Sequence, residues 1–153
     1  MRVGTVNIFS FVLENDIDDL YIIEGLLKKH NITNYKLFQK TKDLLENLTA
    51  DIHIILIDHY LEGGLLGTDV CKEIKKISKD SFVIIVTGQT SMDIVIEYLN
   101  SCANKYINKN RPGYLEKLKE FLDDGLAHAV ARVNEINTLT TMRQEIKERR
   151  KHF

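Results

Sequence analysis

Apolar and amphipathic segments alternate along the whole chain. Runs rich in Ile, Val, Leu and aromatic residues predict strands at residues 6–13, 35–39, 52–57, 81–88 and 105–108. Apolar residues at three- and four-residue spacing predict helices at 16–30, 41–50, 68–78 and 91–102, and a last helix that begins near Pro112. Thr41 is the expected N-cap of the second helix. The first helix carries acidic residues in its first turn, where the helix dipole favours negative charge.

This order of elements predicts an α/β fold. Strands that read as continuous apolar runs are typical of parallel sheets covered on both faces. Strands that alternate with helices indicate right-handed crossovers, and five of them suit a flavodoxin-like doubly wound parallel sheet of order 2-1-3-4-5. In such sheets, ligands bind beyond the carboxyl ends of the strands. The polar residues found there are Glu14, Asn15, Asp16, Asp58, Thr87, Gly88 and Lys109.

Asp58 follows an apolar strand directly, and an unpaired carboxylate there costs free energy. Carboxylates and a backbone carbonyl together form an oxygen-only site that suits Mg²⁺. With Lys109 and a cation to neutralise a phosphoryl group and Thr87 to donate a hydrogen bond, Asp58 is a candidate nucleophile. Each residue also has a simpler interpretation, as a turn residue, a strand residue, a helix cap or a solvated lysine.

Four segments resemble the response-regulator receiver domain of two-component signalling systems, over residues 6–122. "VLENDIDDL" is similar to its acidic-pair segment and "LIDHYLEGGLLGTDV" to its phosphoacceptor segment. "IIVTGQ" is similar to its hydroxyl segment and "ANKYINK" to its aromatic and lysine segment. All four occur in the family's order and on the expected elements, which makes the resemblance specific.

The resemblance implies a phosphorelay function and a role for each matching residue. Asp58 would accept a phosphoryl group from a histidine kinase or phosphotransfer protein, and Lys109 would contact it. The Mg²⁺ ligands would be Glu14, Asn15, Asp58 and the backbone carbonyl of Tyr60. Thr87 and Tyr106 would shift on phosphorylation and alter a protein-interaction surface formed by the fourth helix, fifth strand and fifth helix. Catalysis would be limited to the domain's own phosphorylation and slow autodephosphorylation.

Two of the chain's departures from the family pattern bear most directly on the site. Asn15 stands where the family usually has Asp, so we expect weaker metal affinity unless Asp16 compensates. Asn110, rather than proline, follows Lys109. These departures keep open a pseudo-receiver that acts as a phosphorylation-independent interaction or dimerisation module. A phosphohydrolase is a third reading, but Tyr60 stands where a second carboxylate would be wanted as general acid.

Composition and charge limit the partners and the cellular compartment that we expect for this chain. The chain has 153 residues, a formal net charge of −1 and no apolar run long enough to span a membrane. Neither a membrane nor direct nucleic-acid binding is therefore predicted. Cys71 and Cys102 read as small, reduced, buried residues, which fits a cytoplasmic protein. His59, beside Asp58, could influence access or dephosphorylation, and the simpler expectation is that it faces solvent.

The chain continues beyond the predicted receiver domain, residues 1–122, as an amphipathic extension, residues 123–153. Apolar residues recur at helical steps to Ile136 and continue with a phase slip at Leu139, Met142 and Ile146. A narrow apolar seam of this kind resembles a coiled coil and favours a homodimer through the C-terminal helix. The alternatives are a helix folded onto its own domain, a linker to an output domain, or a contact of the basic end with an acidic partner.

Overall fold

The structure, a computed structural model, describes residues 7–88 and 91–152. Its elements along the chain are β1 (Phe9–Leu13), α1 (Ile17–Lys29), β2 (Asn34–Phe38), α2 (Thr41–Asn47), β3 (Ile54–Ile57), the 3-10 helix η1 (Glu62–Gly64), α3 (Gly67–Ile77), β4 (Phe82–Thr87), α4 (Met92–Ser101), β5 (Lys105–Asn108) and α5 (Tyr114–Arg150).

The strands form one parallel sheet in the order β2-β1-β3-β4-β5, as the sequence predicts. Leu13 at the end of β1 pairs with Ile57 at the end of β3, and Ile57 pairs in turn with Ile85 in β4. The residues that follow β1 and β3 therefore leave the sheet side by side. This register decides which polar side chains can meet at the carboxyl edge.

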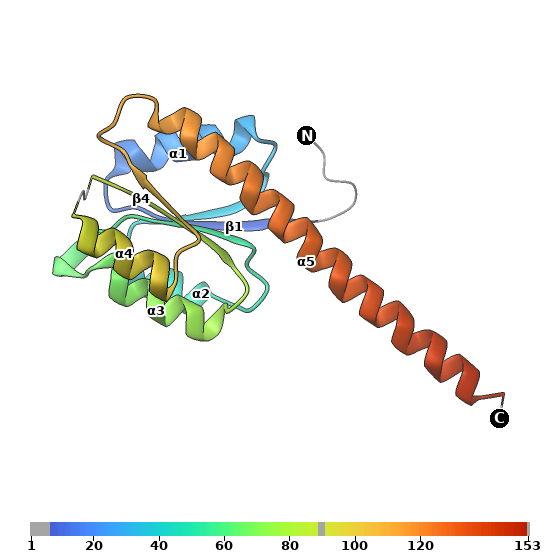
Figure 1. The fold of residues 1–153 in the computed structure, drawn as a ribbon. Helices are drawn as coiled ribbons and strands as arrows, with labels where there is room; N and C mark the ends of the chain where they lie inside the picture. The colour runs from blue at the N-terminus through green and yellow to red at the C-terminus, as the bar shows by residue number, and fades with distance from the viewer. Residues whose placement is uncertain (1–6, 89–90, 153) are drawn as a thin grey trace.

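Helices cover both faces of the sheet, with α1 and α5 on one side and α2, α3 and α4 on the other (Figure 1). Alternate strand residues divide between the two resulting cores. Leu13, Ile55 and Ile57 pack toward α2, α3 and α4, whereas Ile54 and Leu56 pack toward α1 and α5. Every residue of β3 and β4 is buried, which explains their unbroken apolar sequence. Each such side chain stabilises the fold by roughly 1.5–3 kcal/mol relative to exposure.

Some predicted element ends are wrong by a few residues. The N-cap of α2 is Lys40 in an extended conformation, and Thr41 is the first helical residue rather than the cap. Residues 48–50, predicted to be helical, lie beyond the end of α2. The last helix begins at Tyr114, after Gly113 with a φ of 81°, so Pro112 precedes it. Residues 1–6, where the first strand was predicted to begin, lie outside the described residues.

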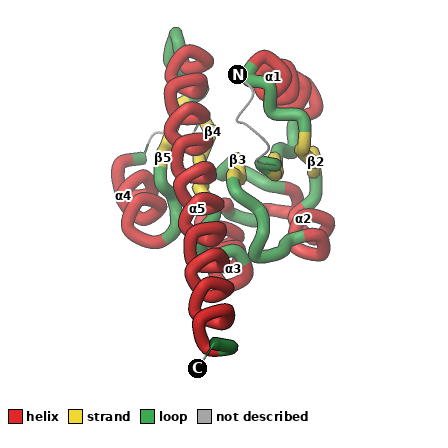
Figure 2. The backbone as a smooth tube through the Cα atoms, turned by 90° about the vertical axis from the view of Figure 1, so that its right-hand side faces the viewer, coloured by secondary structure: helices red, strands yellow, loops and turns green. Residues whose placement is uncertain are grey.

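Helix α5 is a single helix of 37 residues that runs across the sheet and continues well past it (Figure 2). In its first part, one face is buried through Leu118, Leu122, Gly125 and Ala129, and the glycine at position 125 allows close packing. A Cβ there would lie 3.1 Å from the ring of Phe82 and 3.3 Å from the side chain of Ile54. Among the described residues, no helix combines the length and apolarity that crossing a membrane requires.

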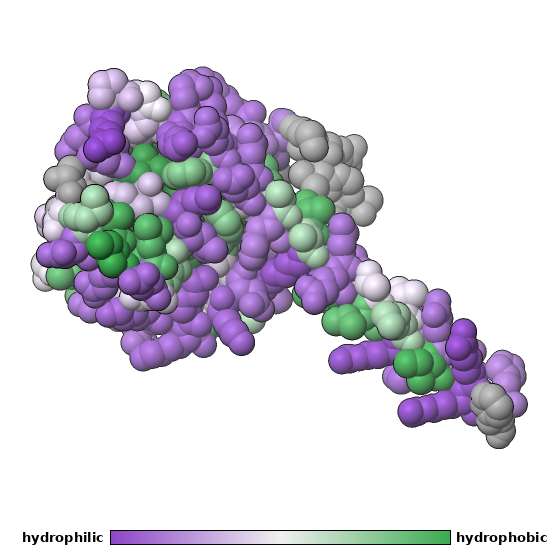
Figure 3. All heavy atoms as spheres, viewed as in Figure 1, coloured by the Kyte–Doolittle hydropathy of each residue, from purple (hydrophilic) through white to green (hydrophobic). Residues whose placement is uncertain are grey.

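Beyond Arg132, whose guanidinium donates to the backbone oxygens of Ala50 and Ile52, the helix projects from the domain. Four apolar side chains of this projecting segment are about half exposed. They are Ile136, Leu139, Met142 and Ile146. Figure 3 shows hydrophobic surface among hydrophilic neighbours on the projecting helix.

Candidate functional site

Polar side chains gather at the carboxyl edge of the sheet, as the strand ends predict. Glu14 follows β1, Asp58 follows β3, Thr87 ends β4 and Lys109 follows β5. Glu14, Asp58 and Thr87 are buried. A buried carboxylate is costly unless it is paired, so the contacts of these side chains show what this edge is built to hold.

Lys109 joins the acidic groups of this edge. Its Nζ lies 3.5 Å from Oε2 of Glu14 and 3.5 Å from Oδ2 of Asp58. It also donates a 2.7 Å hydrogen bond to Oδ2 of Asp19 in the first turn of α1. The sequence reading missed this role of Asp19, because acidic residues in a first helical turn are already explained by the helix dipole. The spacing of Asp19 from Glu14 carried no separate signal.

The buried carboxylates of Glu14 and Asp58 repel each other electrostatically. Burial, together with the negative charge of Asp58, raises the pKa of Glu14 to about 7. For Lys109, burial lowers the pKa, but the hydrogen bond to Asp19 and the charges of Glu14 and Asp58 outweigh burial and raise it overall. The lysine is therefore charged, and this edge still holds more negative than positive charge near neutral pH. Such a site attracts a cation.

The predicted metal ligands fit an oxygen-ligated divalent cation with two carboxylates, those of Glu14 and Asp58. Asn15 and Tyr60 are both exposed and would add neutral oxygens. Asp16, the candidate to compensate for Asn15, has one oxygen engaged, because its Oδ1 accepts from the backbone N–H groups of Asp18 and Asp19 as the N-cap of α1. Within residues 7–88 and 91–152, no group of three or more His, Cys, Asp or Glu side chains forms a metal site.

The lysine loop is held without a proline next to Lys109. The backbone N–H of Lys109 donates to the carbonyl of Thr87 at 3.0 Å. Asn108 Oδ1 accepts from the backbone N–H of Asn110 at 2.9 Å, and Asn110 Nδ2 donates to the carbonyl of Gly88 at 3.3 Å. These amide contacts tie the loop to the end of β4. They explain how Lys109 reaches the acidic groups despite the departure at position 110.

The two predicted switch residues lie on the neighbouring strands. Thr87 is fully buried at the end of β4. Tyr106 is partly buried on β5, and it lines a hollow of about 490 Å³ together with Met92 and Val95 of α4. Burial raises the pKa of Tyr106, and the charges of Tyr60 and Asp58 add to this effect. Tyr106 therefore lies between α4 and the acidic edge, close enough to Asp58 to sense its charge.

His59 does not face solvent, so the simpler sequence expectation is wrong. Only 2% of His59 is exposed, and its Nδ1 lies 2.5 Å from the hydroxyl of Tyr98 on α4. Burial lowers the pKa of His59 and raises that of Tyr98, so an uncharged ring and a protonated phenol share this hydrogen bond. The His59 backbone N–H donates to Oδ1 of Asp58 at 2.7 Å. The residue after Asp58 thus points into the core.

The two cysteines are also paired rather than reduced. A disulfide joins Cys71 of α3 to Cys102, the C-cap of α4, with the Cα atoms 5.8 Å apart. The prediction that both cysteines are buried is confirmed, since Cys71 is fully buried and Cys102 nearly so. Pairing could not be predicted because a separation of 31 residues says nothing about distance until the two helices are packed together.

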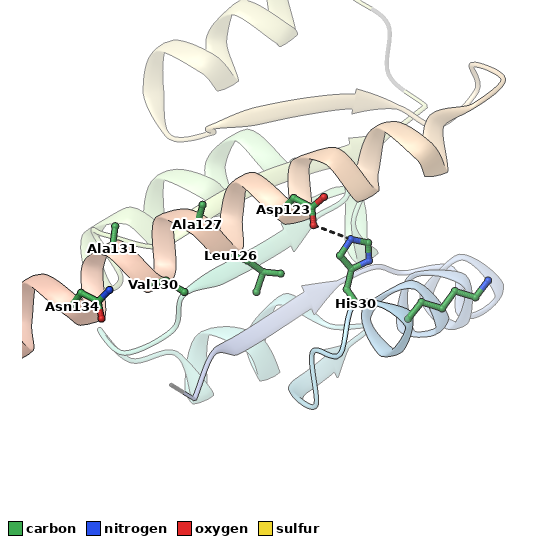
Figure 4. A pocket seen from close by; sticks show the side chains of 8 residues that line it. His30, Asp123, Leu126, Ala127, Val130, Ala131 and Asn134 are labelled. Atoms are coloured by element: carbon green, nitrogen blue, oxygen red, sulfur yellow. Dashed lines mark ion pairs between the residues drawn. The ribbon is translucent and has the colours of Figure 1, made fainter. Parts of the chain in front are cut away.

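A second hollow lies away from this edge, where α5 passes the end of α1 (Figure 4). It has a volume of about 770 Å³ and is lined mainly by small and apolar residues of α5, including Ala127 and Val130. At one end, Nε2 of His30 lies 3.3 Å from Oδ1 of Asp123. This hollow does not reach the carboxyl edge and takes no part in the candidate site.

The sheet order and the acidic edge together define a class of signalling domain, and comparison with known proteins agrees. Residues 11–123 match the family model of the response regulator receiver domain, and the chain belongs to this family. Its members are phosphoacceptor domains that interact with histidine kinases or phosphotransfer proteins and generally bind Mg²⁺ at the phosphorylation site. No curated protein matches the chain.

Solved structures show the same fold. The BeF3-activated receiver domain of DrrB is 22% identical, with a TM-score of 0.70 over 80% of this chain and 99% of that one. A CheY-like receiver protein from Methanospirillum hungatei JF-1 is 23% identical, with a TM-score of 0.65 over 80% and 98%. A receiver protein from Clostridium thermocellum is 23% identical, with a TM-score of 0.68 over 84% and 98%.

Proposed function

We propose that this chain is a phosphorelay receiver that accepts a phosphoryl group on Asp58 from a histidine kinase or phosphotransfer protein. The observation that carries the proposal is the meeting of Lys109 with Asp58 and Glu14, each at 3.5 Å, at the carboxyl edge of the sheet. A buried nucleophile beside a fixed ammonium and a second carboxylate is the arrangement that phosphoryl transfer needs.

The chemistry follows from the positions of the two oxygens of Asp58. Oδ1 is held by the backbone N–H of His59, and Oδ2 faces Lys109. A carboxylate oxygen attacks the phosphorus of a phosphohistidine, the P–N bond breaks, and the imidazole leaves and takes up a proton. Lys109 neutralises charge on the transferring phosphoryl oxygens, and the hydroxyl of Thr87 donates to one of them. Slow hydrolysis of the acyl phosphate returns the domain to its starting state.

Mg²⁺ would be held by Glu14, Asn15, Asp58 and the backbone carbonyl of Tyr60, and it would neutralise further phosphoryl charge when bound. With Asn15 supplying an uncharged ligand, affinity should be lower than in a site with another carboxylate. Phosphorylation would then shift Thr87 and Tyr106 and change the surface formed by α4, β5 and α5.

The test is phosphate incorporation on Asp58. Incubation with a labelled small acyl phosphate and Mg²⁺ should give an acid-labile label in the wild type, and Asp58→Asn should abolish it. The DrrB receiver domain has been solved in a BeF3-activated form, so beryllofluoride binding to this chain is a second readout. Labelling that persists in Asp58→Asn would overturn the assignment.

A pseudo-receiver is the second candidate, and the acidic edge gives it specific support. Asn15 brings no charge, Asp16 is committed to capping α1, and Lys109 already neutralises part of the site through Asp19. In that case, titration with Mg²⁺ should leave the NMR signals of Glu14 and Asp58 unchanged up to high concentration. Saturable shifts at both residues would exclude the pseudo-receiver.

We further propose a division into a receiver domain, residues 1–122, and an extension, residues 123–153, that forms a homodimer through its C-terminal helix. The half-exposed apolar side chains of the projecting part of α5 support this contact, which would resemble a coiled coil. The mass in solution decides it: a full-length chain of monomer mass at micromolar concentration would contradict it.

A cytoplasmic location remains a proposal that rests on the usual place of phosphorelay proteins. The Cys71–Cys102 disulfide argues the other way, because a reducing compartment keeps thiols unpaired. Thiol counting on protein quenched directly from cells measures which applies. Two free thiols per chain would support the cytoplasmic proposal.

A further inference from the structure

The side chain of Tyr98 reaches the back of the phosphoacceptor segment from α4. It is fully buried, and its hydroxyl lies 2.5 Å from Nδ1 of His59. The same hydroxyl lies against Gly67 at the start of α3, where a Cβ would come within 2.3 Å of it. A Cβ at Gly67 would also come within 2.6 Å of the backbone oxygen of Asp58. Tyr98, Gly67 and Asp58 therefore meet in one tightly packed place.

His59 is held on several sides. Its ring meets Tyr60 and Tyr98 edge-on, with centroids 4.8 Å and 5.5 Å apart. Its backbone carbonyl accepts a 2.7 Å hydrogen bond from the N–H of Gly67. Its own N–H donates to Oδ1 of Asp58 at 2.7 Å. Because ring and peptide belong to one residue, a contact that fixes the ring also fixes the N–H that holds Asp58.

Tyr98 is at the same time firmly attached to the C-terminal end of α4. Its backbone carbonyl accepts from the N–H groups of Cys102 and Ala103, and Cys102 is bonded to Cys71 of α3. Its ring lies 6.2 Å, centroid to centroid, from the ring of Tyr106 on β5. A movement of α4 therefore pulls directly on the hydroxyl that holds His59.

We infer that His59 and Tyr98 are positioning residues that fix the Asp58 carboxylate and connect it mechanically to α4. The inference rests on the proposed function and deepens it. With Oδ1 held by the His59 N–H, Oδ2 is directed toward Lys109. The hydrogen bond between Tyr98 and His59 keeps that orientation, and it transmits a change at Asp58 to α4 through the core, separately from Thr87 and Tyr106.

The first experiment removes one oxygen atom. Tyr98→Phe keeps the ring and loses the hydrogen bond to His59, so the amide signal of His59 should move in the NMR spectrum of the unphosphorylated protein. The rate of labelling by acetyl phosphate with Mg²⁺ should fall by about fivefold, the usual worth of one hydrogen bond. Tyr35→Phe is the matched control, since it removes a 2.9 Å hydrogen bond to Glu24 away from the site and should change neither readout.

The second experiment asks whether the two side chains act together. His59→Leu should also slow labelling, and the double variant with Tyr98→Phe should be no slower than the slower single variant. Losses that multiply would overturn the pairing. On addition of beryllofluoride, the amide signals of α4 around Tyr98 should shift in the wild type and shift less in His59→Leu. An equal response in both would overturn the connection to α4.

The outcomes separate this inference from the proposed function. If the His59 amide moves in Tyr98→Phe but the wild type takes neither phosphate nor beryllofluoride, the proposed function fails and the positioning contact stands. If the amide does not move, or moves while the labelling rate is unchanged, the positioning role is overturned. Thermal unfolding followed in parallel ensures that all variants are compared in the folded state.

Discussion

Asp58 is held from two sides that differ in kind. The charged side consists of Lys109, Glu14 and Asp19. It lies at a partly open edge, where Asp19 is about one-third exposed. On the other side stand neutral groups, His59 and Tyr98, which are almost completely buried. The charged side can respond to a cation, a phosphoryl group or pH. The neutral side is set by packing, and it responds when an atom is added or removed.

Loss of Lys109 should have the largest effect, and it belongs to the charged side. Lys109→Ala leaves Glu14, Asp19 and Asp58 without the ammonium that joins them. We expect labelling of Asp58 to fall about 100-fold, because a preorganised charge at the transferring group is lost. The measurement is the initial rate with acetyl phosphate and saturating Mg²⁺.

Lys105→Ala provides the control for this variant. The Lys105 ammonium lies 3.7 Å from Asp124, and the pair is more exposed than the Lys109 pairs. Its loss should leave the rate unchanged. If the labelling rate of Lys109→Ala were within twofold of the wild-type rate, the charged side would take no part in phosphoryl transfer.

A methyl group at Gly67 should have the next largest effect, on the neutral side. In Gly67→Ala the new Cβ would come within 2.3 Å of the Tyr98 hydroxyl and 2.6 Å of the Asp58 backbone oxygen. Since backbone cannot yield as a flexible side chain does, we expect the free energy of unfolding to fall by about 2 kcal/mol. Urea denaturation measures this loss.

Gly25→Ala is the opposite case and serves as its control. Position 25 lies in α1 with nothing within 4 Å of the Cβ site, so alanine should stabilise the protein by about 0.5–1 kcal/mol. If neither variant changed the free energy of unfolding, His59 and Tyr98 would not form the tightly packed contact described above.

The pH dependence of Glu14 should give an effect of similar size and again concerns the charged side. Burial and Asp58 raise the Glu14 pKa from 4.5 to about 7, so the folded carboxyl keeps a proton that the unfolded chain has lost. The stabilising contribution of Glu14 is thus full below about pH 4.5 and is lost as the pH rises through about 7. Relative to wild type, Glu14→Gln should be more stable at pH 8 than at pH 5 by about 2 kcal/mol, at roughly 1.4 kcal/mol per pKa unit.

Addition of Mg²⁺ provides a second test of the role of Glu14. Bound to the ionised carboxylate, it should stabilise the wild type at pH 8, do little at pH 5, and stabilise Glu14→Gln less at either pH. Thermal unfolding with and without Mg²⁺ is the measurement. A pH-independent response would mean that Glu14 is not a ligand.

Except for Asp19, the charged side was predicted from the sequence and the neutral side was not, for a physical reason. Strand ends can be located from apolar periodicity, and a parallel sheet brings them to one edge, so Glu14, Asp58 and Lys109 could be grouped without coordinates. The direction of the His59 ring depends on the turn that follows β3, which periodicity does not describe. The partner of that ring, Tyr98, lies in a helix whose packing angle the pattern leaves open.

The same limit explains the other differences. Cys71 and Cys102 were correctly expected in helical segments, but only the packing of α3 against α4 brings them together. The C-terminal helix was expected from its spacing and is present, yet periodicity does not tell which part is covered. Leu122 is fully buried whereas Leu139 is about half exposed, although both belong to the same kind of repeat.

The continuity of α5 gives the molecule a lever. Its root, near Tyr114, is beside the lysine loop and lines the same hollow as Tyr106, and its tip is at Arg150. The part beyond Arg132 is roughly 27 Å long at 1.5 Å per residue. Counted from Tyr114, the 37-residue helix is about 55 Å long, so a tilt of about 5° at the root would carry the tip by roughly 5 Å. A small rearrangement at β5, which leaves its side chains packed, would thus displace the far end of α5 by about the rise of one helical turn.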